Sequence, residues 1–518
     1  MVAALLRVVH GGVQDARLLP EKGRPNPKFF VKAFVRAGRF TTQWVRLDFD
    51  TRPVLGTAST ITLPRKGQLI SRLYLVTEMP DISTQQNAAR AWCVANGKTF
   101  AGPTFGWTNS VGHAVLNEAS IEIGGVRVEQ VDGRLLEVLD DYYTPLEKVS
   151  LMDRLLPRNS TSFTPGEFGS ESVTRAVTPL PFWFCRGDPG AFLPIDAIQA
   201  DLVRLTVRFN PLATLYTCTA QQQFSMTSAP AGGDAYFPLA ESPFYYLDPS
   251  GEFVEGLGGN PNLSLRVSKI PGVALPSAQQ IVLGAETYIM AEYVYLDRPE
   301  ANRFRLADIQ IPVIQHQPFD PVATEGATFV NCYLRVPNPT RNLFFYLQRK
   351  EAPYYNAPFL ATRDLSGADG PTVPWWPNAS VISTRSYKEL VPAFAFRNSE
   401  PLNAISLIYE GKLYRYSTDA PALFRSLIPS LELKKSPWVN RYFYVLPFAL
   451  QSGLMPPSLP YGEANLDKIT KINLNLGIAP YAGYSGPAYT PQYLVHIWAE
   501  TYNILRVYGG RAGMMFAN

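Results

Sequence analysis

The sequence has little charge, few cysteines and no long apolar run. Charged residues make up 17% of the 518 residues, and 47 Lys+Arg against 43 Asp+Glu leave a formal charge of +4. The basic residues are scattered, with pairs such as Lys434-Lys435 as the densest spots, so we expect no specific binding of nucleic acid. No window approaches the roughly 18 consecutive apolar residues of a membrane helix, and Arg7 interrupts the early apolar stretch at residues 2–6. We therefore expect neither a membrane span nor a signal peptide.

The sequence also lacks the residue spacings that hold metals, cofactors or reacting groups. Its cysteines are too far apart for a zinc site or a dense disulfide framework, which predicts free thiols in a reducing compartment. Its histidines are isolated, which predicts that they satisfy structural hydrogen bonds rather than bind a metal. The residues concerned are Cys93, Cys185, Cys218, Cys332, His10, His113, His316 and His496. Because phosphate-binding glycine motifs and a Gly-x-Ser-x-Gly elbow are absent too, we predict no catalytic residues, no cofactor site and no metal site.

Proline, glycine and aromatic residues are abundant and favour short strands joined by long loops. The chain has 45 Pro and 37 Gly, which interrupt helices, and 27 Tyr and 29 Phe, which favour strands. At residues 120–129, apolar and polar residues alternate around Gly124-Gly125, the pattern of a hairpin with a two-residue turn. The same alternation predicts strands with one solvated face at residues 203–209 and 471–476.

One segment, residues 135–156, has the spacing of a helix. Its apolar residues recur every three or four positions, and Pro145 must bend or end the helix. We therefore expect a short helix that lies over a sheet.

Four kinds of block recur in the same order in the two halves of the chain. They are a glycine-turn hairpin, an aromatic strand with Leu-Pro-Phe, an alternating strand opened by Asp, and a strand that contains Ala-Glu. The paired segments are 121–128 with 407–414, 180–184 with 444–448, 201–205 with 467–472, and 291–296 with 499–505. The shared order predicts two β domains of one kind with a boundary near residues 298–305. The first domain is longer because of an insertion at about 213–280, whose Gly, Pro and Ser content is typical of a surface loop.

Four local patterns could carry chemistry or binding, and each has a simpler structural interpretation. Asp48-Phe49-Asp50-Thr51 resembles a phosphatase motif, but Arg52 stands where that motif has Thr or Val. Asp140-Asp141 could serve glycoside hydrolysis, although neighbours on a helix point about 100° apart, and a solvated or capping pair is the simpler interpretation. Arg186-Gly187-Asp188 spells an adhesion tripeptide in a predicted turn. Trp375-Trp376 could stack on a sugar, or anchor a neighbouring protein, which we favour.

A longer series of segments points to one family. The segments are Gly12 to Ala16, Phe29 to Lys32, Phe40 to Gln43, Leu63 to Ile70, Gly112 to Val115, Ile121 to Gly125, Leu180 to Phe184, Leu193 to Gln199, Tyr293 to Glu300, Tyr502 to Val507 and Gly513 to Asn518. In this order, and over nearly the whole length, they resemble the major capsid proteins of the nucleocytoplasmic large DNA viruses. The chain departs from that family at residues 463–469, where the family has an Asn-Phe-Ser-Arg-Ile-Asp segment, and at 213–280 and 351–400.

The resemblance implies an all-β fold of two tandem eight-stranded jelly rolls (a double jelly roll), with long loop insertions and a few short helices. Residues 1–27 would form an N-terminal arm, residues 28–300 the first jelly roll with its insertion at about 213–280, and residues 301–518 the second. Three chains would then bring six similar domains around one axis. The resemblance therefore implies a structural protein, not an enzyme, that forms pseudo-hexagonal homotrimeric capsomers on the facets of an icosahedral capsid.

The resemblance also implies partners and a location. The partners are two further copies, neighbouring capsomers, minor capsid and penton proteins, and an internal membrane beneath the arm, which has five basic side chains, counting His10, and two acidic ones. The location is the virion capsid, assembled in the host cytoplasm. Two alternatives stay open. A jelly-roll carbohydrate-active enzyme would need two carboxylates about 5–10 Å apart, and a glycan- or receptor-binding protein would need an exposed pocket near Trp375 or residues 186–188.

Overall fold

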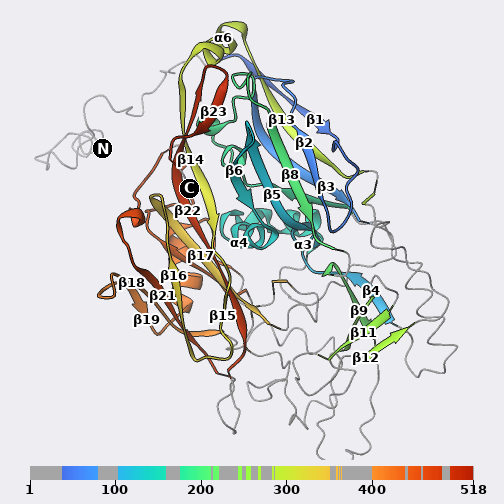
Figure 1. Cartoon of the computed structure of the whole chain (residues 1–518), viewed down its shortest axis with the longest axis vertical. Coiled ribbons are helices and arrows are strands. Elements are labelled where there is room, and N and C mark those ends of the chain that lie inside the picture. Colours follow the sequence, from blue (N-terminus) through green and yellow to red (C-terminus); the bar gives the residue numbers. More distant parts are fainter. Residues whose placement is uncertain are drawn as a thin grey trace, which may run out of the picture. The chain divides into compact units, whose positions relative to one another are not determined.

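The computed structural model describes most of the chain. The described residues are 38–79, 103–158, 175–211, 214–220, 243–247, 252–257, 266–269, 283–284, 286–350, 358–359, 361, 363, 400–437, 441–456, 459–480 and 490–516. The predicted arm at 1–27 and Trp375-Trp376 lie outside them. Strands in antiparallel sheets dominate the described part, and helices are few and short (Figure 1).

The first set of eight strands forms two four-stranded sheets. One sheet has the order β1-β13-β3-β7 and the other the order β2-β8-β5-β6. The strands are β1 (Phe40–Leu47), β2 (Ala58–Thr62), β3 (Leu69–Glu78), β5 (Leu116–Ile123), β6 (Val126–Val131), β7 (Arg175–Pro179), β8 (Val203–Phe209) and β13 (Tyr288–Leu296). Counted along this set, the first, eighth, third and sixth strands share one sheet, and the second, seventh, fourth and fifth share the other.

The second set of strands repeats that order. Its sheets run β14-β22-β17-β20 and β16-β21-β18-β19, with the short strands β15 and β23 added to β22. The strands are β14 (Ile309–Pro318), β15 (Val322–Ala323), β16 (Phe329–Leu334), β17 (Thr340–Arg349), β18 (Leu402–Tyr409), β19 (Leu413–Thr418), β20 (Phe443–Pro447), β21 (Ile472–Ile478), β22 (Tyr493–Tyr508) and β23 (Arg511–Met514). This strand order is that of a jelly roll. The expected fold of two tandem jelly rolls is therefore confirmed.

Both predicted hairpins are present and join corresponding strands. Gly124 and Gly125 connect β5 to β6 with φ of 59° and 82°, the left-handed conformation that a two-residue turn between twisted strands requires. Glu410 and Gly411 connect β18 to β19 with φ of 48° and 71°. The remaining repeated blocks also fall on corresponding strands, at or beside β7 and β20, β8 and β21, and β13 and β22. One detail was wrong, because β7 ends at Pro179 and the aromatic segment after it contains a short 3-10 helix, η3 (Trp183–Cys185).

The predicted helix is present and ends before Pro145. Helix α4 (Gly133–Tyr143) begins at Asp132, whose side chain accepts a hydrogen bond from the Leu135 N–H at 2.8 Å. Its first residue must be glycine, because a Cβ there would lie 2.1 Å from the carbonyl oxygen of His113. The other short helices are α3 (Val111–Ala114), η2 (Leu146–Lys148), α5 (Val149–Leu155), η4 (Pro189–Ala191), α6 (Arg298–Leu306), the π-helix η8 (Leu423–Leu427), α8 (Ile428–Glu432) and η9 (Leu466–Lys468). Among the described residues, no helix has the length and hydropathy needed to cross a membrane.

The insertion at about 213–280 contains more than a loop. It supplies four strands, which pair with β4 from the segment between β3 and β5 to form a five-stranded sheet, β12-β11-β10-β9-β4. The strands are β4 (Pro103–Trp107), β9 (Tyr216–Ala220), β10 (Pro243–Leu247), β11 (Glu252–Leu257) and β12 (Arg266–Lys269). The predicted domain boundary near residues 298–305 stays a prediction; α6 lies there, between β13 and β14.

Candidate functional site

The two jelly rolls meet where α4 packs on the sheet β14-β22-β17-β20 (Figure 1). The rings of Tyr142 and Tyr143 on α4 lie 5.7 and 6.2 Å from the ring of Phe344 on β17. Trp498 on β22 donates from Nε1 to Oδ2 of Asp132 at 3.0 Å. Because this sheet also packs on β16-β21-β18-β19, both of its faces are covered, and all ten residues of β17 are buried. We call this contact region the junction.

Glu137 of α4 forms the centre of a buried charge cluster at the junction. The Glu137 carboxylate is fully buried and accepts a hydrogen bond from Arg441 of the second jelly roll. It also lies 2.5 Å from Nδ1 of His113, 2.9 Å from Oγ of Ser110 and 3.6 Å from Nη1 of Arg158. Burial opposes the ionisation of Glu137, but Arg441, Arg158 and His113 outweigh it and hold the pKa of this carboxyl well below its ordinary value. The cluster therefore joins the two jelly rolls through an ionised carboxylate.

Asp140 and Asp141 belong to the same cluster, so the interpretation as a solvated or capping pair was wrong. Both side chains are buried. Asp140 pairs with Nη1 of Arg158 at 2.6 Å, and Asp141 lies 3.5 Å from Nη1 of Arg441 and 3.6 Å from Nζ of Lys435. Burial raises the pKa of Asp141 above its ordinary value despite these cations, whereas Arg158 holds the pKa of Asp140 below its ordinary value. Arg158 is shared by Glu137 and Asp140, and Arg441 by Glu137 and Asp141, which is the arrangement of a structural ion cluster.

A second buried cluster surrounds Glu500 of β22. Its carboxylate accepts hydrogen bonds from Nη1 of Arg186 at 2.7 Å, from the Tyr143 hydroxyl at 2.9 Å and from Nδ2 of Asn342 at 2.6 Å. Burial opposes ionisation, but Arg341, Arg186 and His316 lower the pKa of Glu500 to about 2. This cluster also joins the two jelly rolls, because Tyr143 and Arg186 come from the first and Glu500 and Asn342 from the second.

The structure does not support the adhesion interpretation of Arg186-Gly187-Asp188. The Arg186 guanidinium is largely buried, and it binds Glu500 and Nε2 of His316, the latter at 2.8 Å. The Asp188 side chain accepts the N–H of Gly190 and caps η4. Both side chains of the tripeptide, those of Arg186 and Asp188, are therefore used inside this chain.

Three of the four histidines satisfy structural hydrogen bonds, as predicted. His113 binds Glu137, His316 lies 3.2 Å from Glu129, and Nε2 of His496 lies 2.9 Å from Oε1 of Gln348. His10 lies outside the described residues. Burial, and to a smaller extent Arg134, lower the pKa of His496 to about 3. His496 is therefore neutral in the folded chain at any pH well above 3.

We expect His496 to make the chain less stable in mild acid. Below pH 6.5 the unfolded chain binds a proton at His496 and the folded chain does not, so the free energy of unfolding falls as the pH drops from 6.5 towards 3. For one proton the slope is about 1.4 kcal/mol per pH unit. His496→Gln keeps a side chain that can bond to Gln348, and it should flatten the profile between pH 6 and 4 by about that amount. Urea unfolding at several pH values measures the slope. An unchanged slope would show that His496 is already protonated in the folded chain.

The outer faces of two corresponding sheets differ in chemistry. On β5 and β8, Glu118 is paired in register with Arg208, and Glu122 with Arg204. The corresponding strands of the second jelly roll carry the row Tyr333, Asn473, Ile408 and Tyr414, which has no charge. Side chains on this sheet are strongly exposed, with Phe329 at 57%, Tyr333 at 62% and Tyr414 at 61%. We call the side chains Phe329, Asn331, Tyr333, Asn473, Asn475 and Tyr414 the uncharged face.

The remaining features that the sequence analysis singled out are the Asp48-Phe49-Asp50-Thr51 pattern and the cysteines. Asp48 is exposed and pairs with Arg46 at 2.8 Å, and the Asp50 N–H bonds to the Thr60 carbonyl at 2.9 Å. Cys185 and Cys332 are free thiols, and Cys93 lies outside the described residues. Within the part of the chain that the structure describes, no group of three or more His, Cys, Asp or Glu could hold a metal ion.

The sequence alone does not reveal the residues that form the junction. Glu129, Glu137 and Glu500 lie within segments that are predicted as strands or a helix, and no local motif marks them. The available signal was a single carboxylate inside a run of apolar residues, as in Ile497-Trp498-Ala499-Glu500. Such a residue is buried only with a charged or hydrogen-bonding partner, and the sequence does not say which one.

Comparisons with known proteins agree on one family. A model described as "Major capsid protein N-terminus" matches residues 28–246, and one described as "Large eukaryotic DNA virus major capsid protein" matches residues 305–513. The major capsid protein of Frog virus 3 (isolate Goorha) is 21% identical over 94% of this chain and 92% of its own length. Two further relatives match in part. The "Probable capsid protein 4" of Acanthamoeba polyphaga mimivirus is 24% identical over 42% of this chain, and the major capsid protein of Pyramimonas orientalis virus is 27% identical over 41%. These matches span only 39% and 48% of the relatives' own lengths.

Solved structures show the same fold. The VP54 protein of PBCV-1 superposes with a TM-score of 0.63 over 95% of this chain and 100% of that chain, at 18% identity. The Faustovirus major capsid protein superposes with a TM-score of 0.57 over 94% of this chain and 93% of that chain, at 11% identity. At such identities the likeness establishes the fold alone.

Proposed function

The chain belongs to the large eukaryotic DNA virus major capsid protein family, a family of structural proteins rather than enzymes, and from this premise we propose that three copies form a pseudo-hexagonal capsomer. Such capsomers would tile the facets of an icosahedral capsid. Two jelly rolls with the same strand order give each chain two similar domains. Three chains around a threefold axis then place six similar domains in a ring, which is an outline that packs into flat arrays.

The observation that carries the proposal is the junction. A tile must keep its two domains at a fixed angle, because each domain meets a different neighbour. Buried ion clusters centred on Glu137 and Glu500 join the jelly rolls here, together with the Tyr142–Phe344 and Tyr143–Phe344 ring contacts. Such clusters add specificity of arrangement, since any other docking angle would leave buried charges unpaired.

The exposed apolar residues support lateral association. A monomeric protein seldom exposes large apolar patches, and those that occur are often interfaces. Besides the uncharged face, apolar side chains are exposed at the end of η8, on α8 and on the loop after β20. These are Leu427, Leu431, Leu450, Leu454, Leu459 and Tyr461. The backbone of this loop bonds to Glu432 at the end of α8, so the two segments adjoin.

The finer assignments extend the same proposal. We take residues 28–300 and 301–518 as the two domains and residues 1–27 as an arm at the base of the capsomer. Neighbouring capsomers, minor capsid and penton proteins, and a membrane beneath the arm are the proposed partners. The proposed location is the virion, with assembly in the host cytoplasm.

The solution mass of the purified chain tests the proposal. Light scattering should give three times 57.5 kDa, and images of the same peak should show a hexagonal outline. A well-folded monomer that stays monomeric at high concentration, with or without a co-expressed chaperone, would contradict the trimer. Turnover of a glycan that one carboxylate substitution abolishes would contradict the structural role itself and favour the enzyme alternative.

A further inference from the structure

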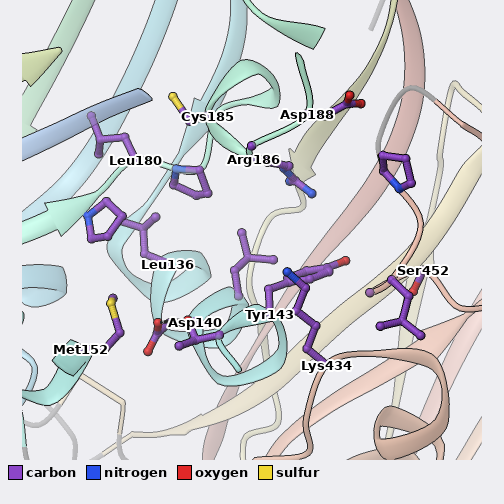
Figure 2. A pocket seen from close by; sticks show the side chains of 18 of the residues that line it. Leu136, Asp140, Tyr143, Met152, Leu180, Cys185, Arg186, Asp188, Lys434 and Ser452 are labelled. Atoms are coloured by element: carbon purple, nitrogen blue, oxygen red, sulfur yellow. Dashed lines mark hydrogen bonds between the residues drawn. The ribbon is translucent and has the colours of Figure 1, made fainter. Parts of the chain in front are cut away.

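A cavity of about 460 Å³ opens at the junction, beside the Glu500 cluster. Its walls come from α4, from the segment between β7 and η4, and from the loop after β20 (Figure 2). Much of the wall is apolar. The apolar side chains include Leu136, Leu139, Met152, Leu180, Leu454 and Met455. Leu454 is largely exposed, whereas Leu136 and Leu139 are buried, so the cavity runs from the surface to the side of α4. Its volume is within the range of small-molecule sites.

Cations dominate one side of this cavity. Arg186, Arg341 and Lys434 all line it. Figure 2 shows the side chains of Arg186 and Lys434 reaching towards one another beside Tyr143. Burial lowers the pKa of Lys434, and the positive charges of Lys148 and Arg186 lower it further. The ammonium group of Lys434 therefore lies close enough to other cations to be repelled by them.

The carboxylates beside this cavity contact groups other than Lys434. The Glu500 carboxylate lies 2.7 Å from Nη1 of Arg186 and 4.0 Å from Nε of Arg341. Asp140 pairs with Arg158, and Asp188 accepts the Gly190 N–H. Among the described residues, the Lys434 ammonium has neither an ion pair nor a hydrogen bond.

Two buried donors in the wall are also unused. Nε of Arg186 and Nε of Arg341 have no hydrogen-bond partner within the described structure. Arg341 is 3% exposed, and a buried N–H without an acceptor costs free energy. These two N–H groups are themselves closed to solvent, so an acceptor oxygen in the cavity would reach them only after the guanidinium groups reorient.

We infer that this cavity binds an aliphatic carboxylate, with its head group at Arg186, Arg341 and Lys434 and its chain along the apolar wall. The negative charge of the ligand carboxylate complements the ammonium of Lys434, and its two oxygens can accept hydrogen bonds from several donors at once. The alkyl chain would displace water from the leucine and methionine side chains. Every residue that lines the cavity belongs to a single chain, so the inference does not require a trimer, although Leu454 at the cavity mouth is also among the exposed residues that we propose for lateral association.

Isothermal titration of the full chain with dodecanoate, below its micelle concentration, tests the inference. We expect one saturable site per chain, with affinity that falls as salt is added. Dodecanol and dodecyltrimethylammonium should bind much more weakly, because they lack the negative head group. Equal affinity for dodecanol, or the absence of a saturable site, would overturn the inference. Tighter binding of dodecyl phosphate than of dodecanoate would overturn the choice of a carboxylate.

Two variants and a control locate the site. Lys434→Gln should weaken dodecanoate binding about five- to tenfold, the equivalent of one partly exposed charge-assisted contact. Met455→Trp should weaken it by filling the cavity. Lys412→Gln removes an exposed lysine at the turn between β18 and β19 and should leave the affinity unchanged. All three variants should unfold at the temperature of the parent within a few degrees. A site that survives both Lys434→Gln and Met455→Trp would lie elsewhere, and the inference would fail.

Discussion

Glu137→Gln is expected to destabilise the chain by about 3 kcal/mol, the typical cost of breaking a buried ion pair by removing one partner. The substitution nearly preserves shape, removes the negative charge and replaces one acceptor oxygen by an N–H₂ donor. Arg441 and Arg158, which are almost completely buried, would each lose a countercharge, and the neutral amide could not compensate them. Urea unfolding followed by tryptophan fluorescence measures the change in the free energy of unfolding.

Glu118→Gln is the matched control for this substitution. Glu118 pairs with Arg127 at 3.6 Å on the outer face of the first jelly roll, where the Arg127 side chain is 59% exposed. Exposed pairs contribute little, so we expect a change below about 1 kcal/mol. Equal effects of Glu137→Gln and Glu118→Gln would mean that the junction cluster contributes no more than a surface pair.

A double-mutant cycle separates the charge from the packing. Arg441→Met alone should destabilise the chain, because it leaves Glu137 with less compensation in a buried site. Added to Glu137→Gln, however, it removes the uncompensated cation, so the double variant should be more stable than the sum of the single effects predicts. Additive effects would show that Glu137 and Arg441 do not interact energetically.

The sequence predicted the local elements well because their signals are local. Alternation and a positive-φ glycine pair suffice for the β5–β6 hairpin, and Pro145 suffices to end α4. The repeated blocks lie on or beside five corresponding strands of each jelly roll, whose sheets have the same strand order. The insertion was misjudged, because the pairing of β9 with β4 depends on a partner more than a hundred residues away.

The junction could not be predicted for the same physical reason. Arg441 is 304 residues from Glu137, and Arg186 is 314 residues from Glu500. Each of these charges looks like an ordinary surface residue until its partner is known. Asp140-Asp141 was misjudged in this way, since a carboxylate pair on a short helix is usually solvated. The resemblance to a family supplied the fold and the class of protein, and the structure supplied the residues that join the domains.

Tyr333→Lys should convert the proposed trimer into monomers without unfolding the chain. Tyr333 is 62% exposed on β16, so its replacement costs the isolated chain little, although its hydroxyl bonds to the Thr470 carbonyl. In an assembly the same residue would be buried against a neighbour, where a lost tyrosine typically costs about 2 kcal/mol and an introduced buried charge costs more. Three equivalent contacts per trimer raise the total to about 6 kcal/mol, which lowers the association constant about ten-thousandfold.

Tyr508→Lys is the control for Tyr333→Lys, because it places the same charge outside the uncharged face. Tyr508 is 65% exposed at the end of β22, outside the uncharged face, and its replacement introduces the same charge. Light scattering across a concentration series should give a monomer of 57.5 kDa for Tyr333→Lys and a trimer for Tyr508→Lys, with unfolding midpoints close to that of the parent. If Tyr333→Lys still forms trimers and Tyr508→Lys does not, the interface lies at the end of β22. The uncharged face would then be free to contact a neighbouring capsomer. In that case Tyr333→Lys would prevent the association of trimers into an array and would leave the trimer itself intact.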